Sequence, residues 1–437
     1  MARLTSSLNK PVTTDVCFLT PGQPSNNPRL VKEADALTES GYTVQVLCMD
    51  CGLWPSQTDS SVLAVRPWGC RYVGGMVQRR SWAYRFTRLR HACSKRALHW
   101  FAGPESLWMA AMVRVGPEIE AAALRHPAKL YIAHHASVLP AAVKAAAKYG
   151  ARVGYDAEDF YTEMHGVAKP QDLLGRIAER IERKYLKSCD YVTAASPGIA
   201  DAYPEKYPIP RPVTVLNVFP LAQRPPAFRS GTAPGPLRLY WFSQCIGSGR
   251  GIEDVVRAMG LLSGANIELH LRGNWRAGYR ERLVDLARSV GVSGHRIVGH
   301  APAPPDEMVR LAAEYDVGLA LELPVERNRT LCLTNKLFVY LLAGNAIIAT
   351  NVEAQQSQVS KLGAAGWCYE PGDIQTLAAG IDKWYKDRED LERSRRRAWD
   401  WGGRRYNWDT EKQTFLNVVE GVARNPSRNA GVSVSVA

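Results

Sequence analysis

The segment that most constrains this chain is an amphipathic helix that leads directly into a short buried strand. The sequence predicts that the helix begins after Thr334-Asn335-Lys336 and runs to Gly344, and that the apolar run 345–349 forms the strand. Threonine and asparagine are favourable N-cap residues, so the helix start presents free N–H groups and the positive end of the helix dipole. With the charge of Lys336 these groups suit a diphosphate. An ordinary buried helix with a capped start is the alternative.

The length of the chain favours two domains. It has 437 residues, which is too long for one ordinary hydrophobic core. No apolar run reaches the roughly 20 residues of a membrane helix, and the N-terminus has no apolar segment typical of a secretory signal. The nine cysteines are scattered and odd in number, which argues against a disulfide framework. We therefore predict a cytoplasmic protein.

Strands and helices alternate along both halves of the chain. In the first half, predicted strands at 16–19, 42–48, 129–133, 152–156, 191–196 and 213–217 are separated by helices such as 29–40 and 137–149. In the second half, predicted strands are 237–242, 267–272, 296–298, 317–321 and 346–349, with helices at 252–262 and 279–290. Such repeated βαβ units predict a parallel, doubly wound sheet in each half.

The predicted domain boundaries follow from this alternation. Residues 1–220 form the first Rossmann-like domain, a proline-rich and glycine-rich stretch at 221–236 is a linker, and residues 237–424 form the second domain with terminal helices at 373–399 and 410–422. The tail 425–437 is predicted to be disordered. Two such domains place a ligand cleft between the carboxyl ends of their sheets.

Several motifs, in order along the chain, resemble those of one enzyme family. The Asn335–Gly344 helix resembles the signature NKLFEYLAAG, Tyr155–Glu163 resembles a "YDAHE…E" segment, and Asp190–Ser196 and Leu216–Val218 are similar to two strand ends of that family. The family is glycosyltransferase family 4, and the resemblance covers about residues 15–422. It implies the GT-B fold, in which two Rossmann-like domains face each other across a cleft. It also implies transfer of a sugar from a nucleotide diphosphate with retention of configuration.

The second domain carries the predicted donor site. A glycine-rich turn containing Arg250 and Gly251 precedes a helix, an arrangement that binds anions. The diphosphate is therefore assigned to Arg250, Gly251, Thr334, Asn335 and Lys336. The sugar and nucleoside are assigned to residues after predicted strands and in the first loop, namely Gly22, Arg272, Gly273, Glu322, Glu326 and Asn328. Simple turns explain the glycines equally well.

The catalytic candidates follow strands of the first domain. His134 and His135 end one strand, and the family resemblance implies a histidine or aspartate near this place that orients sugar or acceptor hydroxyls. Glu158 and Asp159 follow the next strand, where one of them is a candidate general base or an anchor for the acceptor hydroxyl. The alternative for the carboxylates is a solvated acidic loop. No cysteine or aspartate lies at ligand spacing from the histidine pair, so we predict no metal and no cofactor.

Two glutamates typical of the family are missing from this chain. Family members carry one glutamate at the place of Leu331 and another, which binds the donor ribose, at the place of Val339. Glu322, Glu326 and Asn328 are the nearby substitutes. Two alternative functions stay open, a catalytically impaired GT-B scaffold and a GT-B nucleotide-sugar epimerase. A nicotinamide oxidoreductase is disfavoured because no GxGxxG follows the first strand.

Positive charge is concentrated between residues 76 and 114. The chain has a net charge of +13, which favours anionic partners, and this segment interleaves arginines and lysines with tryptophan, tyrosine and phenylalanine. Such a surface suits an anionic membrane, while a solvated basic face is the alternative. No nucleic-acid-binding signature accompanies it. We predict a nucleotide-sugar and a glycan or lipid-linked acceptor as partners, in envelope or exopolysaccharide synthesis at the inner membrane face.

Overall fold

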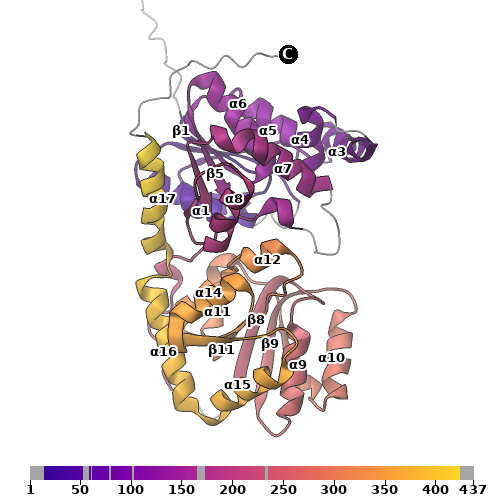
Figure 1. The fold of residues 1–437 in the computed structure, drawn as a ribbon, viewed down its shortest axis with the longest axis vertical. Helices are drawn as coiled ribbons and strands as arrows, with labels where there is room; N and C mark the ends of the chain where they lie inside the picture. Colours follow the sequence, from indigo (N-terminus) through magenta and orange to yellow (C-terminus); the bar gives the residue numbers. More distant parts are fainter. Residues whose placement is uncertain are drawn as a thin grey trace, which may run out of the picture.

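The computed structural model describes residues 14–52, 59–60, 62–77, 80–100, 103–164, 173–231 and 235–423. These residues form two parallel sheets, each with helices on both faces, stacked along the long axis of the molecule (Figure 1). The first sheet has the strand order β3-β2-β1-β4-β5-β6-β7 and the second has β10-β9-β8-β11-β12-β13. The α/β class predicted from the alternation of strands and helices is confirmed.

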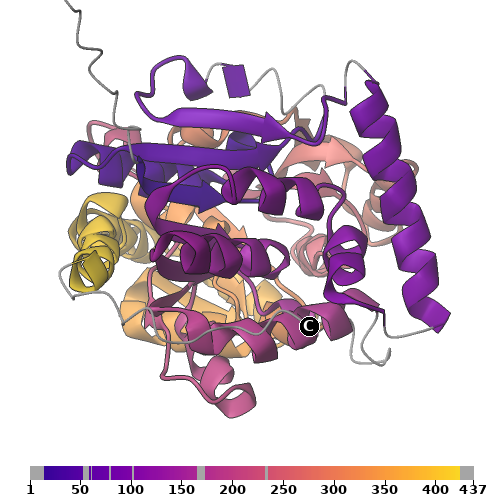
Figure 2. The same cartoon turned by 90° about the horizontal axis from the view of Figure 1, so that it is seen from above.

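The first sheet lies within residues 14–214. Its strands are β1 (Thr14–Leu19), β2 (Val44–Met49), β3 (Gly69–Val73), β4 (Ala128–His134), β5 (Arg152–Ala157), β6 (Tyr191–Ala194) and β7 (Val213–Thr214). Its helices are α1 (Pro28–Glu39), α3 (Trp82–Trp100), α4 (Glu105–Met112), α5 (Gly116–Ala123), α6 (Leu139–Tyr149), α7 (Leu173–Tyr185) and α8 (Pro197–Lys206). The long helix α3 lies at the margin of this domain in both views (Figures 1 and 2).

The second sheet lies within residues 237–369. Its strands are β8 (Leu237–Ile246), β9 (Ile267–Trp275), β10 (Ile297–His300), β11 (Val317–Ala320), β12 (Ala346–Thr350) and β13 (Gly366–Tyr369). Five helices lie between strands β8 and β12, namely α9 (Ile252–Leu261), α10 (Tyr279–Ser289), α11 (Met308–Ala312), α12 (Arg327–Leu331) and α13 (Asn335–Ala343). Helix α14 (Glu353–Leu362) lies between β12 and β13, and α15 (Ile374–Lys386), α16 (Arg388–Arg404) and α17 (Trp408–Ala423) follow the last strand.

The structure differs from the sequence prediction mainly at the sheet edges and in the last helices. The edge strands β3 and β13 were not predicted, and the predicted helix 373–399 is two helices, because Asp387 caps the start of α16 by accepting a hydrogen bond from the amide of Asp390. Strand β9 continues past the predicted end at Arg272. The tail 425–437 lies outside the described residues. The domain boundaries themselves stay predictions.

The chain returns to the first domain through α17. The amide of Trp408 donates to the carbonyl of Phe219 over 2.8 Å, and Glu411 accepts a hydrogen bond from the amide of Leu216 over 2.8 Å. Lys32 of α1 donates to Asn217 and to the carbonyl of Val218. Helix α17 therefore packs beside α1 (Figure 1). The segment 216–219, where the chain leaves the first domain, is hydrogen-bonded to α17, where the chain returns to it.

Helix α13 is held in place by α16. Every residue from Lys336 to Ala343 is buried, and Gly344 ends the helix in the left-handed conformation with φ of 77°. A Cβ added to Gly402 of α16 would lie 2.5 Å from the carbonyl oxygen of Leu341, so the two helices touch backbone to backbone. The glycine thus sets the position of the helix that carries the predicted diphosphate site.

We expect Gly402→Ala to destabilise the protein. The new methyl group collides with the backbone of α13, and overpacking of this kind costs about 1–3 kcal/mol. Gly421→Ala in α17 is the matched control, because nothing lies within 4 Å of the added Cβ, and the better helix propensity of alanine adds up to about 1 kcal/mol. Urea midpoints of both variants measure the difference. Equal midpoints for Gly402→Ala and the wild type would contradict the contact.

Candidate active site

Each sheet reverses its strand order at one point, and the predicted site residues gather there. In the second sheet the reversal falls between β8 and β11, and in the first between β1 and β4. Ligands of open α/β sheets bind outside the carboxyl ends of the strands at such switch points. The turn after β8 contains Arg250 and Gly251, and Glu322 follows β11. His134 and His135 end β4, and Gly22 follows β1.

Four predicted donor residues converge at the switch point of the second sheet. Gly251 has φ of 72°, and a Cβ there would lie 2.9 Å from the carbonyl oxygen of Leu321, so the turn after β8 touches the segment after β11. Glu322 lies next to that contact and accepts a hydrogen bond from Nζ of Lys336 over 2.6 Å. The structure therefore brings Arg250, Gly251, Glu322 and Lys336 together.

The charges in this group compensate one another. Burial favours the neutral form of Glu322, but Lys336, followed by Arg329 and Arg250, outweighs burial and holds the pKa of this carboxyl below its usual value. Nζ of Lys336 also lies 5.6 Å from the centroid of the Trp241 ring. An ionised carboxylate is thus surrounded by three cationic side chains, and an entering anion would meet positive charge already in place.

Helix α13 begins at Asn335, two residues before the predicted start after Lys336, and the side chain of Thr334 makes no capping hydrogen bond. Thr334 is the N-cap residue with extended backbone angles, and Asn335 is exposed at the first helical position. Within the described part of the chain, the buried Oγ1 of Thr334 has no hydrogen-bond partner. The first N–H groups of an α-helix have no partner within the helix. The helix start therefore offers unused polar groups beside Lys336.

Arg272 and Gly273 lie within β9 rather than after it. Arg272 donates to the hydroxyl of Tyr240 over 3.0 Å and to the carbonyl of Ala301 over 2.8 Å. Gly273 has φ of 146°, and a Cβ there would lie 2.1 Å from the carbonyl oxygen of Ser243 in the irregular part of β8. Close packing of the two strands explains this glycine without a nucleoside. Its role in donor binding stays a prediction.

Asp159 and Asn328 join the two domains. Nδ2 of Asn328 donates to Asp159 over 3.0 Å, and Oδ1 of Asn328 accepts from the amide of Phe160 over 2.7 Å. Burial raises the pKa of Asp159. Leu331, at the first family glutamate position, is 3% exposed, and its carbonyl accepts from Ser196 over 2.6 Å. Helix α12 is thus an interdomain contact. Glu326, directly before it, pairs with Arg329 over 3.2 Å.

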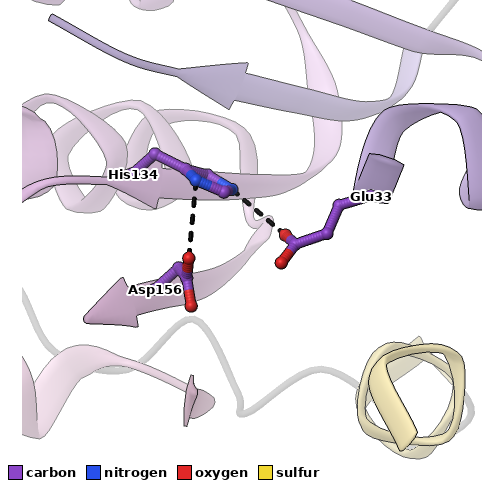
Figure 3. Close-up of side chains that lie close together, drawn as sticks. All are labelled: Glu33, His134 and Asp156. Carbon is purple, nitrogen blue, oxygen red and sulfur yellow. Dashed lines mark hydrogen bonds and ion pairs between the residues drawn. The ribbon is translucent and has the colours of Figure 1, made fainter. Parts of the chain in front are cut away.

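His134 lies in a buried network of charges in the first domain. Its Nε2 is 3.1 Å from Glu33 and its Nδ1 is 2.7 Å from Glu158 and 3.5 Å from Asp156. Figure 3 shows the ring between Glu33 of α1 and Asp156 of β5. Burial opposes protonation, but the carboxylates, Glu33 first, outweigh it and raise the pKa of His134 to about 10. His134 is therefore a buried cation.

Arg29 completes this network and was missed by sequence reasoning. Its guanidinium forms two hydrogen bonds with Asp156, of 2.6 and 2.7 Å, and lies 3.4 Å from Glu33. The sequence alone carried no clear signal, because the burial of Arg29, Lys32 and Glu33 among the apolar residues of α1 is visible only in the structure. Charged residues on the inner face of a helix are rare unless they are paired.

The carboxylates of this network do not form a good metal site. Glu33, His134 and Asp156 have ligand atoms within 4.8 Å of one another, which is the arrangement that a metal ion needs. However, a metal would have to displace the proton of His134 and the guanidinium of Arg29, which donates to both oxygens of Asp156. The prediction that no metal is needed stays a prediction.

His135 has a different environment from its neighbour. Its φ is 99°, a strained value for a residue with a side chain. Nδ1 accepts the amide proton of Ser137 over 3.0 Å, and the ring lies 4.2 Å from that of Tyr161. Burial lowers the pKa of His135 to about 4. The imidazole is thus neutral with its proton on Nε2, which suits a hydrogen bond to a hydroxyl group.

The remaining first-domain candidates lie around the same sheet edge. The amide of Gly22 donates to Oγ1 of Thr20 over 3.2 Å, within the loop after β1. Glu158 is partly exposed and accepts a hydrogen bond from Asn27 over 2.6 Å as well as lying beside His134. Glu158 and Asp159, although adjacent in sequence, therefore have different partners. None of these contacts assigns a catalytic role.

Comparison with known proteins identifies the class. Residues 27–218 match the family model described as a glycosyl transferase 4-like domain. Sucrose-phosphate synthase from Thermosynechococcus elongatus has a TM-score of 0.67 at 14% identity, covering 94% of this chain and 99% of its own. A glycosyltransferase from Rickettsia africae gives 0.65 at 11%, covering 95% and 100%. HepE of Anabaena in complex with UDP gives 0.65 at 13%, covering 93% and 100%. No curated protein matches.

These likenesses confirm the GT-B fold for the whole chain. Residues 27–218 match a glycosyl transferase 4-like domain, and the chain has the GT-B fold of the solved glycosyltransferases that it resembles.

The charged network of the first domain gives a pH-dependent stability. The pKa of His134 is about 10 in the folded protein and about 6.5 in an unfolded chain. Its contribution is therefore complete below about pH 6.5 and is lost as the pH rises through about 10. We expect His134→Gln to be destabilised most near pH 6.5, with a deficit that shrinks toward pH 10, as measured by urea unfolding at each pH.

Two controls isolate this effect. Burial lowers the pKa of Lys32 to about 7, which gives a contribution of opposite sign over much of the same pH range, but both proteins contain Lys32 and the difference between them removes it. His295→Gln changes an exposed histidine and serves as the matched variant. A deficit of His134→Gln that is equal at pH 6.5 and pH 10 would exclude a protonated His134.

Proposed function

We propose that this protein transfers a glycosyl group, with retention, from a nucleoside diphosphate sugar to a glycan or lipid-linked acceptor in the synthesis of an envelope or exported polysaccharide. The observation that carries the proposal is the convergence of Arg250, Lys336 and the start of α13 at the switch point of the second sheet. Uridine is the first base to test, because the similar HepE of Anabaena was solved with UDP and with UDP-glucose.

The leaving diphosphate is the group that needs stabilisation. As the glycosidic bond breaks, negative charge grows on its oxygens, and preorganised donors lower the barrier. Lys336 pairs with Glu322, and a diphosphate would replace this carboxylate as its partner. Glu322 would then accept hydrogen bonds from sugar or ribose hydroxyls. Glu322 would thus provide the carboxylate that is missing at positions 331 and 339, where this chain has Leu331 and Val339.

The acceptor hydroxyl is assigned to the edge of the first sheet. His135 is neutral, carries its proton on Nε2 and is fixed by Ser137, so it orients an oxygen without adding charge. Glu158 is partly exposed and follows β5, the strand that pairs with β4, and it is the candidate general base. Two rival functions, a non-catalytic scaffold and an epimerase, are separated from transfer by product analysis with and without an acceptor.

Nucleotide binding is tested by thermal stabilisation. We expect one of UDP, GDP, ADP and TDP to raise the melting temperature, because a ligand at 100 times its Kd adds about 2.7 kcal/mol to the stability of the folded state. The increase should vanish in Lys336→Ala and persist in Lys361→Ala, which removes an exposed lysine from α14. If Lys336→Ala keeps the full increase, or if no nucleotide stabilises the wild type, the donor site is misassigned.

The absence of a metal requirement is tested separately. Because Arg250 and Lys336 already supply positive charge at the diphosphate site, we expect sugar release from the donor to continue at an unchanged rate in excess EDTA. The rate is measured by nucleotide production. A loss of activity that Mg²⁺ or Mn²⁺ restores would show that the proposal of metal-free chemistry is wrong.

A further inference from the structure

Helix α3 exposes its apolar side chains and buries polar ones. Trp82, Phe86, Leu89 and Trp100 are 85%, 62%, 65% and 88% exposed, whereas the buried residues of the helix are Thr87, Ser94 and Leu98. The four exposed positions recur at helical spacing and so lie along one face. A helix of a globular protein normally turns its apolar stripe toward the core. No residue that the structure describes covers this face of α3.

The arginines around α3 fall into two groups. Arg90 and Arg114 point toward the domain, where Arg90 pairs with Glu118 over 2.5 Å and Arg114 donates to the carbonyl of Asp50. Arg80, Arg85 and Arg88 are exposed, and none of the three has a salt bridge to any residue that the structure describes. The unpaired charges therefore lie on the solvent side together with the apolar face.

A groove brings these two features together. A cavity of about 580 Å³ is lined by Arg80, Arg85 and Arg88 together with Tyr84 and Leu89, and it has no acidic residue in its wall. Such a groove suits a phosphate group that is attached to an apolar chain. The guanidinium groups bind the phosphate oxygens, and the apolar side chains lie along the chain.

We infer that α3 binds the surface of a bilayer that contains anionic phospholipids. The helix lies in the plane of the interface, Trp82, Phe86, Leu89 and Trp100 enter the boundary between headgroups and acyl chains, and the arginine groove holds a headgroup phosphate. Helix α3 lies at the margin of the first domain (Figure 2), and the four apolar side chains are exposed there. No helix among the described residues is long and apolar enough to span a membrane.

This inference rests on the proposed function, because a lipid-linked acceptor is the reason for binding a membrane. Its test, however, needs neither donor nor acceptor. Flotation with vesicles of phosphatidylcholine alone, and of phosphatidylcholine with one quarter phosphatidylglycerol, measures binding without nucleotide or acceptor. We expect binding to the anionic vesicles only. Vesicle binding without glycosyl transfer would leave the inference standing and remove the proposed function, while transfer without vesicle binding would do the reverse.

Two variants and one control define the surface. Arg85→Gln with Arg88→Gln should weaken vesicle partitioning about 30-fold, since each basic residue near an anionic surface contributes about a factor of five. Arg393→Gln with Arg397→Gln changes the net charge equally on α16 and should leave partitioning unchanged. If both pairs weaken it equally, binding reflects net charge alone and the inference is overturned.

The apolar face is tested by replacing Trp82, Phe86 and Trp100 with serine. Because these side chains are exposed, the melting temperature should stay within a few degrees of the wild type, and vesicle binding should be lost. Retained binding overturns the inference. So does sedimentation showing that the wild type is a dimer and the triple variant a monomer, because the face would then be covered by a second copy.

Discussion

The buried ion pair between Arg29 and Asp156 is the interaction on which the first domain depends. Both side chains are almost completely buried, and removing two such charges from water is costly unless each is fully hydrogen-bonded. Asp156 meets this condition with two bonds from Arg29 and one from Thr193, and Arg29 also donates to the carbonyl of Val215. The pair thereby ties α1 to β5 and to the crossing into the second domain.

The same network explains why two adjacent histidines differ. His134 points inward, where Glu33, Asp156 and Glu158 stabilise its protonated form, and it neutralises part of the charge that Arg29 leaves uncompensated. His135 follows the end of β4 with a strained backbone, and its ring packs against Tyr161, where burial outweighs the effect of Glu158 and keeps the imidazole neutral. A sequence pair that suggested one function therefore divides into a structural cation and a neutral hydrogen-bond donor.

Sequence reasoning found the parts of the fold that are determined locally. Strands such as β1 and β12 are buried apolar runs, and the start and end of α13 follow from Thr334 and Gly344. The edge strands β3 and β13 were missed because they are short and only partly buried. Arg29 and Glu33 were missed because a polar residue in an amphipathic helix is normally assigned to the solvent face, and only tertiary contacts show otherwise.

The sequence predicted which residue types form the candidate site, but not which of their side chains contact each other. The sequence indicates that Lys336 and Glu322 follow neighbouring elements, yet their contact of 2.6 Å depends on the order of β8 and β11 in the sheet. Val339 and Leu331 occupy apolar packing positions and are 0% and 3% exposed, so neither side chain is free to be replaced by a charge without a new partner. In this protein both positions therefore serve packing rather than donor binding.

Net charge alone does not identify a binding surface in this protein. Helix α16 and helix α3 are both rich in arginine, but Arg393 and Arg395 of α16 lie within 3.2 Å of acidic residues on the same helix, whereas Arg85 and Arg88 of α3 have no such neighbours among the described residues. Paired arginines gain little from an anionic partner, because binding it would first cost the existing pairs. Arginines without an acidic neighbour, beside exposed tryptophans, have no such cost. A binding surface is therefore indicated by arginines without ion pairs together with apolar side chains that are exposed.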